Sequence, residues 1–241
     1  MRRPCGRMAC AMSSVAAALL LSAFAAETGA QDLKTEVLVP SGGRGAAVIL
    51  LSSDAGPAAH LPFARQLAQT GYYVVLADGK DFLVPFDSGE LRGLHGAANL
   101  KHIIASVQSA PQAMPGKVAV VGFALGGSAS LKHAAPIEES VSAVVAFYPN
   151  LVLLGSDTAG LAAAFKAPVL ILAGEKDRYA GKALRELTAA PKQAAFETIS
   201  YAASGHAFDM PTSAGYVAAD ATDASDKAVL FLKRWHPAAG R

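Results

Sequence analysis

The sequence predicts a doubly wound α/β fold with a mostly parallel sheet, built as a single domain. Five apolar runs are continuous rather than alternating, which indicates strands covered on both faces, as in a parallel sheet between two helix layers. Helical segments separate these runs, and alternation of strand and helix along a chain is typical of α/β proteins. No repeat, linker or change of composition marks a second domain.

The expected strands follow in chain order. The buried ones are Ala46–Leu51, Tyr72–Ala77, Val118–Val121, Val141–Phe147 and Val169–Ala173. Two segments alternate more and therefore predict edge strands. They are Lys34–Val39 and Phe196–Tyr201.

Three helices are predicted with their own signals. Leu61–Thr70 has Pro62 in its first turn and Gly71 just past its end, the expected asymmetry of helix termini. Asn99–Ser109 carries an apolar stripe at i, i+3, i+4 and i+7. Ala221–Trp235 has aspartates early and basic residues late, which matches the helix dipole. The connection 150–166 is only about seventeen residues long, so we expect no large lid and a fairly open pocket.

The first thirty residues predict a secretory signal peptide, which leaves 31–241 as the folded domain. Arg2, Arg3 and Arg7 precede an apolar stretch of about a dozen residues, too short to span a membrane. Small residues follow it, as at a cleavage site. We expect a periplasmic or secreted protein without a membrane span after signal removal; an uncleaved anchor is the alternative.

The positions of the cysteines and the charge balance exclude several classes of function. The two cysteines, Cys5 and Cys10, both lie in the expected signal peptide, so the remaining chain has no thiol nucleophile, disulfide or thiolate metal site. Without residues 1–30 the chain has 18 basic and 18 acidic residues. No basic run predicts nucleic-acid binding.

The most informative segment is Gly122–Gly126, which reads Gly-Phe-Ala-Leu-Gly after an apolar strand and before a small-residue helix. This is the context of a nucleophile elbow, G-x-S-x-G, in which the central side chain stands above the strand end. Here Ala124 holds that position, and a methyl group cannot attack a carbonyl. A plain glycine-rich turn is the alternative. A dinucleotide loop is not favoured, because the G-x-G-x-x-G spacing is absent.

Two further residues complete the order of a hydrolase triad. Asp177 follows an apolar strand, and His206 lies in Gly-His-Ala-Phe after the next expected strand. The order of nucleophile, acid and histidine is that of α/β-hydrolases. The alternatives are that Asp177 caps the helix expected near Ala180 and that His206 has a structural role.

These motifs resemble the dienelactone hydrolase family of single-domain α/β-hydrolases. The similarity rests on Gly122–Gly127, Asp177, Gly205–Phe208 and the early strand, turn and helix at 46–71, and it spans roughly 34–236. It implies hydrolysis of small carboxylic esters or lactones by a cysteine or serine nucleophile. Alanine at 124 departs from both.

An oxyanion hole is expected from backbone N–H groups. One is that of Leu125, and the other lies in the loop 52–56, where Ser53 is favoured and Asp54 is the alternative. A relocated nucleophile among Ser52, Ser53, Ser128 and Ser130 is less favoured, because the first pair lies on the oxyanion side and the second pair points away from the elbow.

The other histidines show no metal-binding spacing, and we expect no metal or other cofactor. They are His60, His95, His102, His133 and His236, expected at the surface or on helix faces.

Three functions follow as hypotheses. The chain is a hydrolase relative that has lost covalent catalysis, a weak hydrolase in which His206 activates water, or a module that uses the pocket to bind an ester- or lactone-like ligand or a partner.

Overall fold

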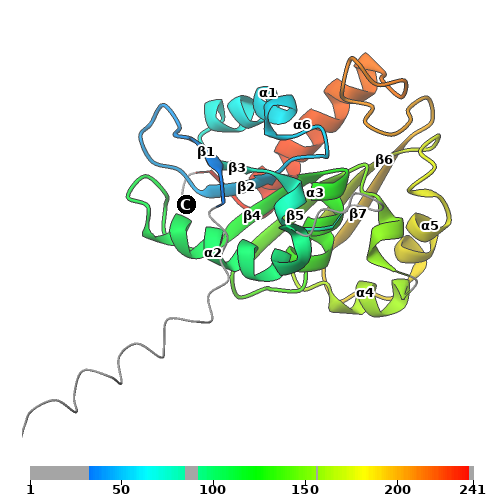
Figure 1. The fold of residues 1–241 in the computed structure, drawn as a ribbon, viewed down its shortest axis with the longest axis horizontal. Helices are drawn as coiled ribbons and strands as arrows, with labels where there is room; N and C mark the ends of the chain where they lie inside the picture. Colours follow the sequence, from blue (N-terminus) through cyan, green and yellow to red (C-terminus); the bar gives the residue numbers. More distant parts are fainter. Residues whose placement is uncertain (1–32, 85–91, 156, 239–241) are drawn as a thin grey trace, which may run out of the picture.

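A seven-stranded sheet forms the centre of the protein (Figure 1). The structure is a computed structural model that describes residues 33–84, 92–155 and 157–238, so the expected signal peptide lies outside the described residues. The strands are β1 Thr35–Leu38, β2 Ala47–Leu51, β3 Tyr73–Ala77, β4 Val118–Phe123, β5 Val141–Phe147, β6 Val169–Gly174 and β7 Phe196–Tyr201. Their order is β1-β3-β2-β4-β5-β6-β7, with β1 antiparallel to β3 and the other neighbours parallel.

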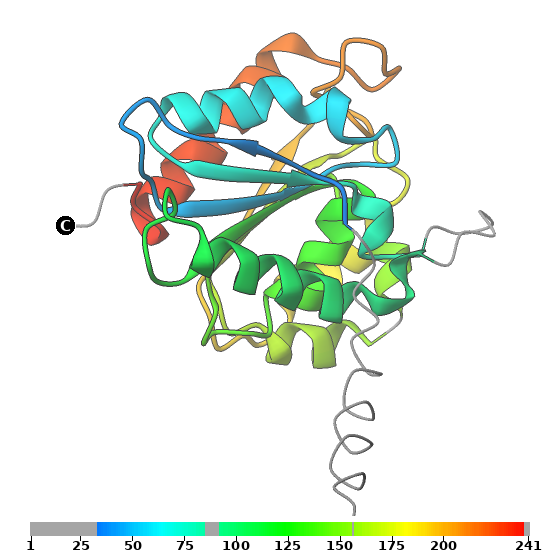
Figure 2. The same cartoon turned by 60° about the vertical axis from the view of Figure 1, so that its left-hand side comes forward.

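Helices cover both faces of this sheet. They are α1 Pro57–Gln69, α2 Gly96–Ser109, α3 Leu125–Ala129, α4 Thr158–Ala164, α5 Gly181–Ala189 and α6 Ala218–Trp235. Helices α1 and α6 pack on one face, and α2, α4 and α5 pack on the other (Figures 1 and 2). The predicted doubly wound α/β fold with a mostly parallel sheet is confirmed.

The continuous apolar runs are explained by burial on both faces. In β2, Val48 and Leu50 join the core beneath α1 and α6, whereas Ile49 and Leu51 join the core beneath the other helices. Every residue of β2 is buried. Alternate side chains of a strand point to opposite faces, so a strand between two helix layers needs apolar residues at every position.

The expected element ends differ from the observed ones mainly at helix starts. Helix α1 begins at Pro57, four residues before the expected start, and α2 and α6 each begin three residues early. The added first turns consist mostly of small residues, which give no apolar periodicity. The connection 150–166 contains a 3₁₀ turn at Leu151–Leu154 and the short helix α4.

The end of α6 is anchored to the sheet through His236, which we expected at the surface or on a helix face. This expectation was wrong, because His236 is only 6% exposed. The Tyr72 hydroxyl donates to the His236 carbonyl at 2.9 Å, and Ser142 Oγ lies 2.8 Å from His236 Nδ1. Burial lowers the pKa of His236 to about 4.

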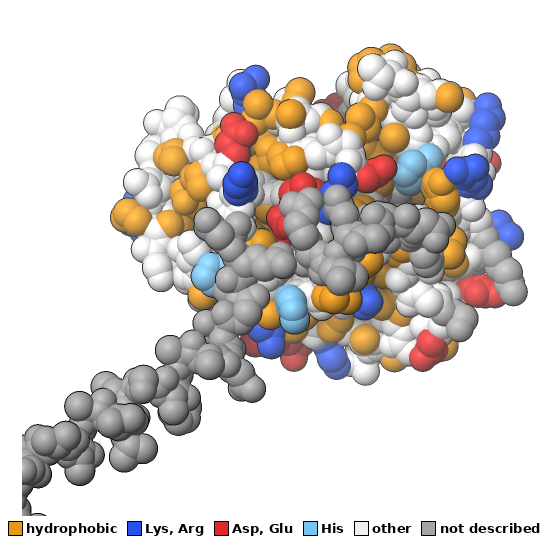
Figure 3. Space-filling view, viewed as in Figure 1, with side chains coloured by type: hydrophobic (Ala, Val, Ile, Leu, Met, Phe, Trp, Pro, Cys, Tyr) orange, Lys and Arg blue, Asp and Glu red, His pale blue; other side chains and the backbone are white. Residues whose placement is uncertain are grey.

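The surface is mixed in charge. Figure 3 shows basic and acidic side chains interspersed with apolar ones on the face viewed in Figure 1. Within the described ranges, no helix is both long enough and apolar enough to cross a membrane.

Candidate active site

Ala124 occupies a strained turn between β4 and α3. Its backbone has φ 45° and ψ −108°, a left-handed conformation that costs a non-glycine residue about 1–3 kcal/mol. The Ala124 N–H donates to the Phe147 carbonyl at 3.0 Å, and the Ala124 carbonyl accepts the Ser128 N–H at 2.9 Å. This is the backbone geometry of an elbow that presents its central side chain at the carboxyl end of the sheet.

The flanking glycines are required by close backbone contact. A Cβ at Gly122 would lie 2.1 Å from the Gly126 carbonyl oxygen. A Cβ at Gly126 would lie 2.3 Å from the Leu51 carbonyl oxygen. The strand, the turn and the helix are therefore packed too closely for any side chain at these two positions.

Asp177 and His206 are joined by a hydrogen bond. Asp177 Oδ2 lies 2.7 Å from His206 Nδ1, and the other carboxylate oxygen accepts the Tyr179 N–H at 2.8 Å. The Asp177 side chain is fully buried, whereas that of His206 is 28% exposed. Helix α5 has Ala180 at its N-cap without a side-chain cap, so the Asp177 carboxylate serves His206 rather than the helix.

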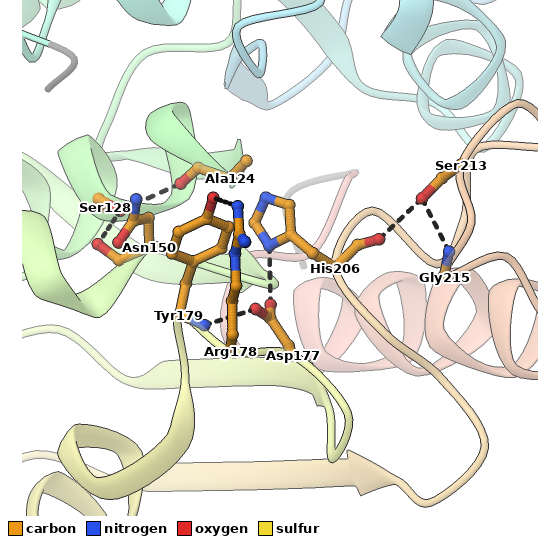
Figure 4. Close-up of polar contacts among 9 residues, drawn as sticks. All are labelled: Ala124, Ser128, Asn150, Asp177, Arg178, Tyr179, His206, Ser213 and Gly215. Atoms are coloured by element: carbon orange, nitrogen blue, oxygen red, sulfur yellow. Dashed lines mark hydrogen bonds and ion pairs between the residues drawn. The ribbon is translucent and has the colours of Figure 1, made fainter. Parts of the chain in front are cut away.

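The His206 ring is held by its neighbours on two sides. Tyr148 and Tyr179 meet it edge to face, with ring centroids at 5.2 and 4.9 Å. The following residue, Ala207, has φ 54°, and Ser213 Oγ donates to the His206 carbonyl at 2.9 Å. Figure 4 shows the ring between the Ala124 turn and the Asp177 carboxylate, with Nδ1 directed at Asp177. Nε2 is left without a hydrogen-bond partner in the described part of the chain.

For the predicted oxyanion hole, the hydrogen bonds distinguish the two candidates for the second donor, Ser53 and Asp54. The Ser53 N–H donates to His60 Nε2 at 3.1 Å, so it is engaged rather than open to a ligand. The N–H groups of Leu125 and Asp54 have no hydrogen bond to a described residue. The alternative, Asp54, therefore fits the second position better than Ser53.

His60, expected at the surface or on a helix face, lies on a face of α1 that is turned inward and is only 2% exposed. Its ring stacks on Phe123 at 4.1 Å, and its Nε2 lies 2.8 Å from the Ser53 hydroxyl. Burial lowers the pKa of His60 to about 4, with a smaller opposing effect from Asp54. The sequence spacing could have predicted this burial, because His60, Ala64 and Leu67 lie at i, i+4 and i+7 on one buried helix face.

The alternative serines make contacts that limit them as nucleophiles. Ser128 Oγ donates to the carbonyls of Ala124 and Asn150, and Ser130 Oγ donates to that of Gly127. Ser52 Oγ donates to the Ser53 carbonyl. Of these four serines, Ser53 alone has its hydroxyl beside a histidine.

No group of three or more potential metal ligands occurs among the described residues. His95 and His102 are exposed. His133 is half-buried, and its Nε2 lies 3.0 Å from the Phe82 carbonyl.

Tyr148 is the site residue that the sequence analysis missed. It follows β5 with φ 34° and is completely buried. Its hydroxyl lies within hydrogen-bonding reach of the Asp209 carboxylate. Burial and the Asp209 carboxylate raise the pKa of Tyr148 well above its usual value.

The mostly parallel seven-stranded sheet between two helix layers matches the α/β-hydrolase fold. More particularly, the chain belongs to the dienelactone hydrolase family, which residues 85–236 match over more than half of the chain. The roles of Ala124, Asp177, His206 and Leu125 within this site stay predictions. No curated protein matches this chain.

Solved structures are similar across nearly the whole fold. A Klebsiella pneumoniae protein assigned as a dienelactone hydrolase has 20% identity and a TM-score of 0.65, over 85% of this chain and 100% of its own. The dienelactone hydrolase-like promiscuous phosphotriesterase P91, from metagenomic libraries, has 19% identity and a TM-score of 0.65. The match covers 84% of this chain and 98% of P91. Esterase 2 of Thermogutta terrifontis, phosphorylated by paraoxon, has 18% identity and a TM-score of 0.65, and the match covers 89% of this chain and 93% of the esterase. At such identities these similarities establish the fold.

Proposed function

We propose that this protein is a dienelactone-hydrolase-like relative of enzymes that hydrolyse small carboxylic esters or lactones, and that its own covalent hydrolysis is lost or much impaired because Ala124 replaces the nucleophile. The observation that carries this proposal is Ala124 in an intact elbow beside a formed Asp177–His206 pair. The family and the esterase among its structural relatives support an ester-like ligand. The methyl group at 124 leaves no side-chain nucleophile at the elbow.

Binding of a carbonyl compound remains chemically reasonable at this site. The N–H groups of Leu125 and Asp54 have no hydrogen-bond acceptor among the described residues, so both can donate to the carbonyl oxygen of a ligand. Such preorganised donors stabilise developing negative charge when they lie close to the oxygen. A ligand held there would place its carbonyl carbon near Ala124.

Weak hydrolysis by water is the second candidate, and the formed Asp177–His206 hydrogen bond favours it. Water would attack the ester carbonyl carbon and pass its proton to His206 Nε2, with Asp177 stabilising the imidazolium. The oxyanion would accept hydrogen bonds from the N–H groups of Leu125 and Asp54. Collapse would then break the bond to the alcohol, which would take the proton from His206. Hydrolases without their nucleophile retain about 10³–10⁴-fold catalysis over water.

We further propose that the chain is exported to the periplasm or the medium after loss of residues 1–30. The basic start, the short apolar stretch and the small residues after it support this proposal.

The test is to restore the nucleophile. Ala124→Ser and Ala124→Cys need no backbone change, so p-nitrophenyl acetate turnover should rise by at least about 10²-fold over the native protein. His206→Ala in the Ala124→Ser background should remove this gain. A folded Ala124→Ser protein no more active than the native one would show that more than the nucleophile has been lost. A purely ligand-binding function would then be the better description.

A further inference from the structure

Tyr148 contacts three side chains of the segment that carries His206. Its ring meets the rings of His206 and Phe208 edge to face, with centroids at 5.2 and 5.5 Å. Its hydroxyl lies within hydrogen-bonding reach of the Asp209 carboxylate. The remaining residue of the segment, Ala207, has φ 54°. One tyrosine at the end of β5 therefore holds the side chains on both sides of this strained residue.

The backbone of Tyr148 is tied to the strand that leads to Asp177. The Tyr148 N–H donates to the carbonyl of Leu172 in β6 at 2.6 Å, and Asp177 lies in the loop after β6. Tyr148 has φ 34°, a left-handed conformation that is costly for a non-glycine residue and persists only where the surroundings hold it. Tyr148 thus connects the strand end that carries the aspartate to the loop that carries His206.

The hydroxyl of Tyr148 is not needed for packing. A phenylalanine at this position would present the same ring to His206 and Phe208. The Tyr148 side chain is completely buried, and so is Oδ1 of Asp209. Burial of a hydroxyl and a carboxylate costs free energy, and pairing them offsets this cost. The contact therefore adds a fixed direction to the tyrosine ring rather than additional apolar burial.

Ionisation keeps the Tyr148 hydroxyl as the donor of this contact. Burial, followed by the effect of the Asp209 carboxylate, raises the pKa of Tyr148, with smaller effects of Asp54 and Asp177. Burial also raises the pKa of Asp209, and the Tyr148 hydroxyl and His206 oppose that rise. Tyr148 therefore stays protonated at neutral pH, and Asp209 lies close enough to His206 for their charges to interact.

We propose that Asp209 and Tyr148 are positioning residues for His206. The Asp209 carboxylate holds the Tyr148 hydroxyl, and the Tyr148 ring keeps the imidazole turned so that Nδ1 donates to Asp177, as the 2.7 Å contact requires. Nε2 is then the nitrogen that can accept a proton. This inference rests on the site proposed above, but it concerns the His206 ring itself and can be tested in the native protein without hydrolysis.

The test is NMR of the ring nitrogens in native protein that is isotope-labelled at histidine, at mildly alkaline pH. His206→Gln assigns the signals, and the nitrogen shifts give the ratio of the Nδ1–H to the Nε2–H tautomer. We expect the Nδ1–H form to predominate in the native protein. Tyr148→Phe should lower the ratio about tenfold, the order of effect expected when one hydrogen bond to a charged group is lost.

Two comparisons separate positioning from a general structural role. Tyr201→Phe is the matched control, because the Tyr201 hydroxyl also donates to a carboxylate, that of Asp223, at 2.9 Å. It should leave the His206 ratio unchanged. Asp209→Ala should reproduce the effect of Tyr148→Phe. Asp209→Asn should retain most of the native ratio, since its amide oxygen can still accept the hydroxyl proton.

The outcomes that refute the proposal are specific. A native tautomer ratio in folded Tyr148→Phe or Asp209→Ala would show that the pair does not position His206. An equal fall in Tyr201→Phe would show that general loosening of the fold explains the change. If Tyr148→Phe does not fold, the comparison of Asp209→Ala with Asp209→Asn decides. An inactive Ala124→Ser protein would leave these signals unaffected, so the two proposals fail independently.

Discussion

His60 Nε2 accepts the backbone N–H of Ser53 at 3.1 Å and so ties helix α1 to the loop after β2. The Ser53 hydroxyl lies 2.8 Å from the same nitrogen and accepts the Ala55 N–H at 3.2 Å. These three contacts fix the loop and leave the Asp54 N–H without a partner among the described residues. The histidine therefore positions the loop in which we predict the second oxyanion donor.

The same contacts predict that the native protein resists serine-directed reagents. Ser53 is only 3% exposed, and His60, with a pKa of about 4, is a weak base for activating its hydroxyl. We expect no stoichiometric labelling by a fluorophosphonate, and none by thiol reagents once residues 1–30 are removed. Ala124→Ser, as the positive control, should be labelled at position 124. Labelling of Ser53 in the native protein, located by mass spectrometry, would identify a relocated nucleophile.

The elbow should be intolerant of side chains at its first glycine. A Cβ at Gly122 would lie 2.1 Å from the Gly126 carbonyl oxygen, a backbone contact that no side-chain rotation relieves. We expect Gly122→Ala to lower the free energy of unfolding by about 3 kcal/mol, measured by urea denaturation. Gly42→Ala is the control, because nothing lies within 4 Å of its Cβ, and its effect should stay within about 0.5 kcal/mol. Equal stability of the two variants would contradict the close packing of the turn.

Most of the sheet could be predicted from sequence, because strands covered on both faces must be apolar throughout. The expected Tyr72–Ala77 and Val141–Phe147 match β3 and β5 to within one residue. The elbow and the placement of Asp177 and His206 after successive strands could be read from the glycine frame and chain order.

The contacts of the buried histidines could not be predicted in the same way. Ser142 and His236 are 94 residues apart, and no local pattern predicts a hydrogen bond between them. Tyr148 likewise depends on how β5 and the loop at 206–209 meet. For His60, the apolar spacing of α1 indicated burial, but the Ser53 contact requires the loop geometry.

Stability should fall with acid through His236. Burial lowers its pKa from 6.5 to about 4, so between these values the unfolded chain binds a proton that the folded chain does not. The neutral, buried His236 ring therefore contributes roughly 3 kcal/mol to the free energy of unfolding. This contribution is fully present above pH 6.5 and is lost as the pH falls toward 4. His236→Gln should therefore show a smaller drop in unfolding free energy between pH 7 and pH 4 than the native protein. His102→Gln, exposed on α2, should retain the native dependence. An unchanged dependence in His236→Gln would argue against a buried neutral ring.

Export predicts a shortened N-terminus. The protein expressed with its native start in a bacterium should be recovered outside the cytoplasm and should begin near Ala26 or Gln31. N-terminal sequencing and intact mass measure this directly. A cytoplasmic chain that begins at Met1 is the contrary outcome, and Arg2→Glu with Arg3→Glu should reduce export if the basic start is used.

Native hydrolysis, if it uses water, should differ from covalent catalysis in its time course. Without a nucleophile at 124 no acyl-enzyme forms, so p-nitrophenol should be released linearly, with no burst equal to the enzyme concentration. His206→Ala should lower this rate to that of buffer, because Nε2 would be the base that takes the proton from water. Asp177→Asn should also lower the rate, since it favours the wrong tautomer of His206. Ala124→Ser provides the contrast and should show a burst. A native rate unaffected by His206→Ala would end the water-activation hypothesis, and the intact Asp177–His206 pair would then serve only to shape the ligand pocket.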